Sequence, residues 1–254
     1  MRIQHFPIVF FVSSFLGLWL STLAGIFIGR RMRPLSEEAR EDYNIVLTST
    51  LTLLGLIIGF SFSMAISRYD QRKNFEEEET NAIGTEYVRA ELLPAADAAA
   101  LKELLGKYVA QRVLFYTTRD QQQLLRINAY TSQLQDQMWS VVRNAAAAKP
   151  LPTTSLAASG MNDVLNSQGY TQAAWLNRIP TEAWVLMIAI AICSNFLVGY
   201  GARQTGTGLF IVLPFVLAIA FFLVSDIDSP RRGGSRVGPQ NLVSLSRSLQ
   251  VNKY

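Results

Sequence analysis

The sequence predicts an all-α membrane protein with four transmembrane helices, arranged as two pairs that flank a helical soluble region. Half of its 254 residues are apolar and 17% are charged, whereas an ordinary soluble domain carries about 25% charged residues. The apolar residues lie in uncharged blocks towards the two ends of the chain, with a charged middle between them. This composition excludes a disordered chain. The single cysteine, Cys193, excludes a disulfide-bonded scaffold.

Four uncharged blocks are long enough to cross a bilayer. They cover residues 8–29, 45–67, 183–202 and 206–225. At about 1.5 Å per residue each spans about 30 Å, the thickness of the hydrocarbon core. The first block ends at a cluster of arginines and not at a small-residue cleavage site, so it is predicted to be a span and not a signal peptide. A short turn separates the last two blocks, which are expected to form a tight hairpin with a kink at Pro214.

The expected boundaries divide the chain into four parts. Residues 1–67 hold the first helix pair, 68–182 the soluble region, 183–225 the second pair and 226–254 a tail. Apolar residues recur at helical spacing in the soluble region, and Pro94 breaks the chain before its first helix. No proline separates Ser67 from Leu93, so the second membrane helix is expected to continue beyond the bilayer, over about 70 Å in all. Any bend is expected at Gly84.

Basic residues near the spans predict that both termini and the soluble region lie in the cytoplasm. The two sides carry Arg2, Arg68, Arg72, Lys73, Arg178, Arg231, Arg232 and Arg236 against Arg30, Arg31, Arg33, Arg40 and Arg203. Under the positive-inside rule, the side with more of these residues faces the cytoplasm. The arginine cluster that follows the first span opposes this assignment.

The second span carries a face of small and hydroxyl side chains. At about 100° per residue the face contains Thr48, Thr52, Gly55, Gly59, Phe62 and Ser63. The glycines form a GxxxG pattern, which is typical of a close helix–helix seam. The same face would line a pore if it surrounded a symmetry axis, with Phe60 or Phe62 as an apolar constriction. Composition alone favours the seam.

Acidic residues follow the second span and end the fourth. The run Glu76 to Glu79 forms either a solvated face or, in a ring of subunits, a vestibule in which Glu76 and Glu79 attract cations. Of the two acids Asp226 and Asp228, the second is interpreted as part of a turn in which Asp228 and Ser229 bind the backbone before Pro230. A cation site there is less favoured, because calcium usually takes about six or more oxygen ligands.

Three segments form a recognisable set: GFSFSMAISRYDQRK, EETNAIGTEYVRAELLP and, after the last span, DIDSPRRG. Their distinctive residues are Arg68, Tyr69, Asn81, Gly84, Arg89, Pro94, Asp226, Asp228 and Pro230. Over essentially the whole chain, this set resembles the bestrophin-like family of bacterial membrane proteins. That family usually has an aromatic residue after the last proline, where this chain has Arg231 and Arg232.

The resemblance implies a channel architecture. True bestrophins, which that family distantly resembles, are pentameric ion channels with cytoplasmic termini, and their second membrane helix lines the pore. Carried over, the pore-lining residues would be Thr48, Thr52, Gly55, Gly59, Phe60, Phe62 and Ser63, with Phe60 or Phe62 at the neck. The resemblance also implies a cyclic homo-oligomer, by analogy a pentamer, in a bacterial inner membrane. When this resemblance is added to the composition, the pore and seam interpretations of the second span are equally favoured.

Three function classes follow. The first is an oligomeric ion channel that meets the lipid bilayer and small ions, with cations slightly favoured. The second is a non-conducting scaffold or sensor that binds a partner through its soluble region. An enzyme has little support, because His5 is the only histidine and the motifs of nucleophile, zinc and phosphate sites are missing from the sequence. No cofactor, metal or nucleic acid is expected.

Overall fold

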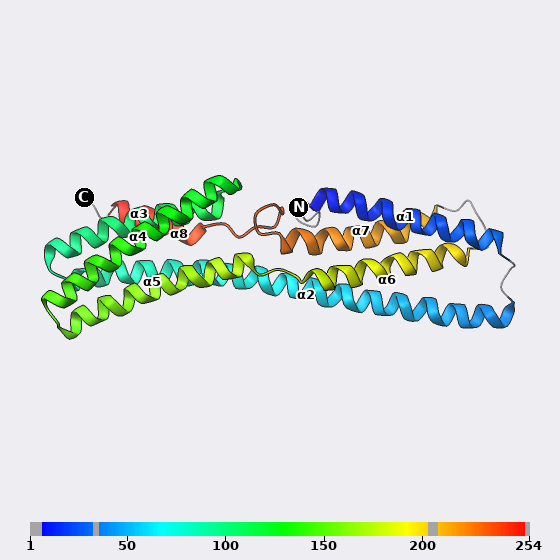
Figure 1. Ribbon diagram of the computed structural model, residues 1–254, viewed down its shortest axis with the longest axis horizontal. Helices are drawn as coiled ribbons and strands as arrows, with labels where there is room; N and C mark the ends of the chain where they lie inside the picture. The colour runs from blue at the N-terminus through cyan, green and yellow to red at the C-terminus, as the bar shows by residue number, and fades with distance from the viewer. Residues whose placement is uncertain (1–6, 33–35, 203–207, 252–254) are drawn as a thin grey trace. The chain divides into compact units, whose positions relative to one another are not determined.

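The computed structural model describes residues 7–32, 36–202 and 208–251, and every regular element in these ranges is helical. The helices are α1 (Pro7–Arg31), α2 (Glu37–Arg89), η2 (Ala90–Leu92), α3 (Ala95–Thr117), α4 (Gln121–Ala148), α5 (Pro152–Leu176), α6 (Thr181–Tyr200), α7 (Leu209–Asp228) and α8 (Gln240–Val251). The predicted all-α class is confirmed (Figure 1). His5 and residues 203–207, where the sequence predicts a short turn, lie outside the described residues.

Four helices are long and apolar enough to cross a membrane. They lie in Pro7–Arg31, Glu37–Leu92, Pro152–Tyr200 and Phe210–Asp228. The first two ranges contain the predicted spans 8–29 and 45–67, and the last two overlap most of the predicted spans 183–202 and 206–225. The second is one uninterrupted helix of 53 residues, from Glu37 to Arg89, so the predicted extension beyond Ser67 is confirmed. The helix passes through Gly84 without a break, and a Cβ atom there would lie 3.4 Å from a side-chain carbon of Leu245 of α8.

The chain forms two compact units, and α2 contributes residues to both. The membrane unit contains α1, α2 up to Tyr69, α6, α7 and the loop up to Arg236. The helical unit contains Asp70–Asn177 and, from Val237 onward, α8. The expected tail is therefore divided: its first residues belong to the membrane unit, and α8 belongs to the helical unit.

In the membrane unit, α1 packs along both α6 and α7, which contact each other much less. Aromatic side chains hold this arrangement together: the Phe10 ring lies 5.1 Å from that of Trp184 and 6.3 Å from that of Phe221. α7 stays helical through Pro214. The helix contacts therefore centre on α1 and do not simply follow the two pairs along the sequence.

The tightest helix contact in the membrane unit joins α1 to α6. A Cβ atom at Gly25 would overlap the carbonyl oxygen of Phe196, and one at Gly199 would overlap the carbonyl oxygen of Thr22. The Asn195 side chain accepts a hydrogen bond from Thr22 Oγ1 at 3.3 Å across the same contact. Small residues and a polar bond are the usual means by which membrane helices associate, and Asn195 acts here as the interhelical contact expected of such a residue.

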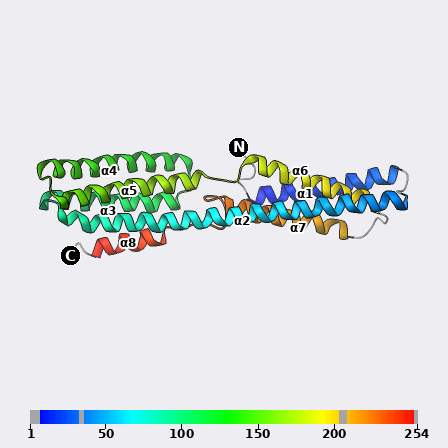
Figure 2. The same ribbon diagram turned by 90° about the horizontal axis from the view of Figure 1, so that it is seen from below.

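The helical unit packs α3, α4 and α5 together with the second part of α2 (Figure 2). The predicted apolar stripes form its core, which includes Leu101, Leu105, Tyr108, Leu134 and Met138. Prolines mark the helix starts: Pro94 precedes α3 and Pro152 opens α5, positions where the missing N–H costs no helical hydrogen bond. Asp120 caps α4 by accepting a hydrogen bond of 2.7 Å from the N–H of Gln123.

Candidate functional site

The predicted pore face of α2 is uncovered within the chain. Its six residues, Thr48, Thr52, Gly55, Gly59, Phe62 and Ser63, are all exposed. A Cβ atom added at Gly55 or Gly59 would meet nothing within 4 Å. The Thr52 hydroxyl donates a hydrogen bond to the carbonyl oxygen of Thr48 at 2.8 Å, so this hydroxyl proton needs no partner outside the helix. No helix in the described part of the chain fills the GxxxG surface at Gly55 and Gly59.

A different face of α2 holds the helix in the membrane unit. Leu54 and Ala65 are buried in the cluster that contains Trp184, Met187 and Phe221. These two positions lie roughly 120° or more around the helix from the centre of the uncovered face. The packing of the chain therefore leaves the small, hydroxyl-bearing face free. Both aromatic candidates are also exposed, Phe60 by 64% and Phe62 by 36%.

The end of α7 is tied to α2 and α6 through Asp228. Its carboxylate lies 3.8 Å from the Arg68 guanidinium of α2. The same carboxylate accepts the backbone N–H of Ile179, which lies just before α6, at 3.2 Å and 3.3 Å. One buried side chain thus links the end of α7 and the segment before α6 to the middle of α2, just beyond its predicted span.

Asp226 organises the loop that follows α7. Its two carboxylate oxygens accept the N–H groups of Gly234 at 2.6 Å and Ser235 at 2.9 Å. Gly233 packs so closely that a Cβ atom there would overlap the carbonyl oxygen of Asp226. Asp226 thus binds N–H groups beyond Pro230, whereas the turn predicted from the sequence involves Asp228 and Ser229, and the Asp228 carboxylate binds the N–H of Ile179 instead.

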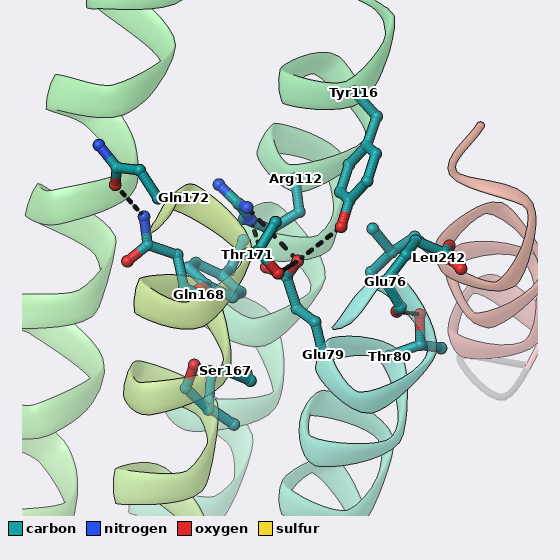
Figure 3. A network of polar contacts seen from close by, with 12 residues as sticks. Glu76, Glu79, Thr80, Arg112, Tyr116, Ser167, Gln168, Thr171, Gln172 and Leu242 are labelled. Carbon is teal, nitrogen blue, oxygen red and sulfur yellow. Dashed lines mark hydrogen bonds and ion pairs between the residues drawn. The ribbon is translucent and has the colours of Figure 1, made fainter. Parts of the chain in front are cut away.

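The structure corrects the expectation that Glu76 and Glu79 face a vestibule, because both side chains are buried, with exposures of 2% and 0%. Glu79 forms an ion pair with Arg112 of α3. It also accepts hydrogen bonds from Thr171 of α5 at 3.1 Å and from Tyr116 at 3.3 Å (Figure 3). Glu79 therefore joins three helices of the helical unit.

Glu76 holds the start of α8. Its carboxylate accepts the N–H groups of Asn241 and Leu242, each at 3.0 Å, and the Asn241 side-chain amide at 2.7 Å. Burial raises the pKa of Glu76, while the N–H groups that bind it act to lower that pKa. A carboxylate at a helix N-terminus also interacts favourably with the helix dipole. The exposed members of the acidic run are Glu77 and Glu78.

A family model described as the Bestrophin-like domain matches residues 16–242, most of the chain. The chain belongs to the Bestrophin-like family. No curated protein sequence matches it.

Solved structures of bestrophin homologues share the fold. A single-substitution variant of a bacterial Bestrophin homologue from Klebsiella pneumoniae is 12% identical, with a TM-score of 0.67 over 96% of this chain and 98% of that one. A crystal structure of a Bestrophin homologue from the same organism, phased from zinc, is 14% identical, with a TM-score of 0.64 over 94% and 97%. At such identities the likeness establishes the fold alone.

The motif residues of this Bestrophin-like chain have mainly structural contacts. Arg89 lies 3.7 Å from Asp163 of α5, and Gly84 adjoins Leu245 of α8. Pro94 begins α3, Tyr69 is half-buried, and Asn81 is exposed on the surface of α2. Of these residues, Arg89 and Gly84 therefore contribute to the contacts of α2 with α5 and α8.

Sequence reasoning missed several residues that the structure brings together. The partners of Glu79, which are Arg112, Tyr116 and Thr171, lie 33 to 92 positions along the chain, and no local pattern links them to it. The close contact of α1 at Gly25 and Gly29 could have been predicted, because these glycines form a GxxxG pattern of their own in α1.

Proposed function

We propose that this Bestrophin-like chain is one subunit of an oligomeric ion channel in which α2 lines the pore. The observation that carries the proposal is the uncovered α2 face of Thr48, Thr52, Gly55, Gly59, Phe62 and Ser63. In this channel, copies of α2 surround a symmetry axis, and their hydroxyls and exposed backbone replace part of the ion's hydration.

Helix packing in the membrane unit supports a pore over a seam within the chain. Among the membrane helices that the structure describes, the glycines that lie directly against another helix's backbone are in the contact between α1 and α6, where α1 has its own pair at Gly25 and Gly29. At Gly55 and Gly59 a Cβ atom would be in open space. A face of this kind needs an occupant from outside the chain, and in the proposed assembly that occupant is the water and ions of the pore.

The proposed setting is a cyclic homo-oligomer, a pentamer by the family resemblance, in a bacterial inner membrane with both termini in the cytoplasm. The expected slight preference for cations depended on Glu76 and Glu79. Since both carboxylates are buried and bonded, that support is gone, and the proposal includes no charge preference.

Ion flux through the purified protein in sealed liposomes tests the proposal, with potassium, sodium and chloride gradients applied separately. Phe62→Ala should raise the flux severalfold if Phe62 forms the apolar neck, because a smaller side chain weakens dewetting. Phe27→Ala is the matched control, since Phe27 is an exposed phenylalanine (64%) on a different membrane helix, α1. If wild type and variants all fail to conduct above empty vesicles, the scaffold or sensor function replaces the channel.

A further inference from the structure

Glu86 is a buried acid in the last turn of α2, and none of the contacts described above accounts for its burial. Its exposure is 0%. Neither carboxylate oxygen accepts a hydrogen bond from any residue that the structure describes. An ionised carboxylate in such a place is costly, because no hydrogen-bond donor of the described residues compensates for its lost hydration.

The backbone of α5 forms the wall over this carboxyl group. A Cβ atom at Gly160 would overlap Glu86 Oε2 and would lie 2.7 Å from Arg89 Nη1. Glycine at this position therefore lets α5 pack directly on the acid. For water to reach Glu86 from that side, α5 has to move away from α2.

The charged groups that act on Glu86 come from both helices of this contact. Arg89, on its own helix, favours the ionised form, and Asp163, on α5, opposes it. Arg89 and Asp163 lie 3.7 Å apart, and Asp163 is well exposed, so part of the Arg89 charge is already balanced at the surface. Burial outweighs the effect of Arg89 and raises the pKa of Glu86 to about 8.

We propose that Glu86 is a proton-binding site that controls the packing of α5 on α2. While Glu86 holds its proton, the neutral acid tolerates the dry contact at Gly160. When the proton leaves, the carboxylate draws in water and α5 loosens. This switch concerns the helical unit alone and is independent of whether the protein conducts ions.

Linkage fixes the direction and size of the effect. The closed contact holds the proton up to a pKa of about 8, whereas the opened contact has the ordinary value of 4.5. Between these two values the closed form binds the additional proton. Local opening of α5 should therefore increase about tenfold for each unit of rising pH in this range.

Hydrogen exchange of the full chain in detergent micelles tests the switch, with rates corrected for the intrinsic effect of pH. In wild type, protection of the α5 amides near Gly160 should fall about 50-fold from pH 6 to pH 8, because the effect begins to level off at the pKa of the closed form. Glu86→Gln should abolish this dependence, and Glu78→Gln, which removes an exposed charge from the same helix, should keep it. Equal slopes in wild type and Glu86→Gln would overturn the proposal.

Infrared spectroscopy tests the proposal on the wild-type protein alone, in case Glu86→Gln fails to fold. Infrared spectra of the wild-type protein should contain the C=O band of a protonated, non-hydrogen-bonded carboxylic acid at pH 6. That band should disappear with a midpoint near pH 8. A spectrum at pH 6 without such a band would also overturn the proposal.

Discussion

Glu79 of α2 and Arg112 of α3 form an ion pair in which both side chains are completely buried. Thr171 of α5 and Tyr116 add hydrogen bonds to the same carboxylate. A buried charge that loses its partner keeps its desolvation penalty, so this pair makes the helical unit sensitive to single changes.

Glu79→Ala should destabilise the helical unit by about 3–5 kcal/mol, because it leaves Arg112 buried and uncompensated. Glu78→Ala, one position away and exposed, should change stability by less than about 0.5 kcal/mol. Chemical denaturation of the full chain in detergent, followed by circular dichroism, measures both. Similar losses in the two variants would contradict the burial of Glu79.

Glu76→Ala should release α8 from α2. The substitution removes the acceptor for the N–H groups of Asn241 and Leu242, and losing hydrogen bonds to a charged group costs about 2 kcal/mol. We expect hydrogen exchange in α8 to become roughly 30-fold faster, while α4 stays protected. Glu77→Ala is the matched control, and equal exchange of α8 in both variants would exclude the Glu76 cap.

Gly25→Ala should weaken the contact between α1 and α6 by about 1–3 kcal/mol, the usual cost of overpacking. The added Cβ would overlap the backbone oxygen of Phe196, which cannot rotate aside. Gly17→Ala, in the same helix, places its Cβ in open space and should be tolerated. Thermal unfolding in detergent compares the two, and tolerance of both would mean that this seam is not close-packed.

The Gly59→Leu variant distinguishes a pore from a close helix seam between copies of this chain. On the proposed channel, the variant folds and assembles normally, since nothing lies within 4 Å of the new Cβ, but its flux falls because the larger side chain narrows the pore. Size-exclusion chromatography and liposome flux report the two properties. Loss of assembly would assign Gly55 and Gly59 to a tight interface between subunits.

The spans and the long α2 helix could be predicted because they depend on local properties. A long uncharged block is stable in the bilayer, and the stretch from Ser67 to Leu93 contains no proline that would end the helix. The same reasoning placed Pro94 at the start of α3.

The roles of the acidic run and of the glycine pairs depend on distant partners. Four consecutive glutamates look alike in sequence, yet Glu76 meets Asn241, 165 positions away, while Glu77 stays exposed. Likewise, α1 and α2 carry the same GxxxG spacing, and only the pair in α1 meets a neighbouring backbone. Local pattern cannot distinguish such cases, because the deciding atoms belong to other helices.

The most direct test of the pore is thiol block of ion flux in a Cys193→Ser background. Thr52→Cys places a thiol on the uncovered face of α2, and Leu53→Cys places one at nearly the same depth but about 100° around the helix. A charged, water-soluble thiol reagent should stop flux through Thr52→Cys and leave flux through Leu53→Cys unchanged. Block of Leu53→Cys with no effect on Thr52→Cys would contradict a pore lined by this face.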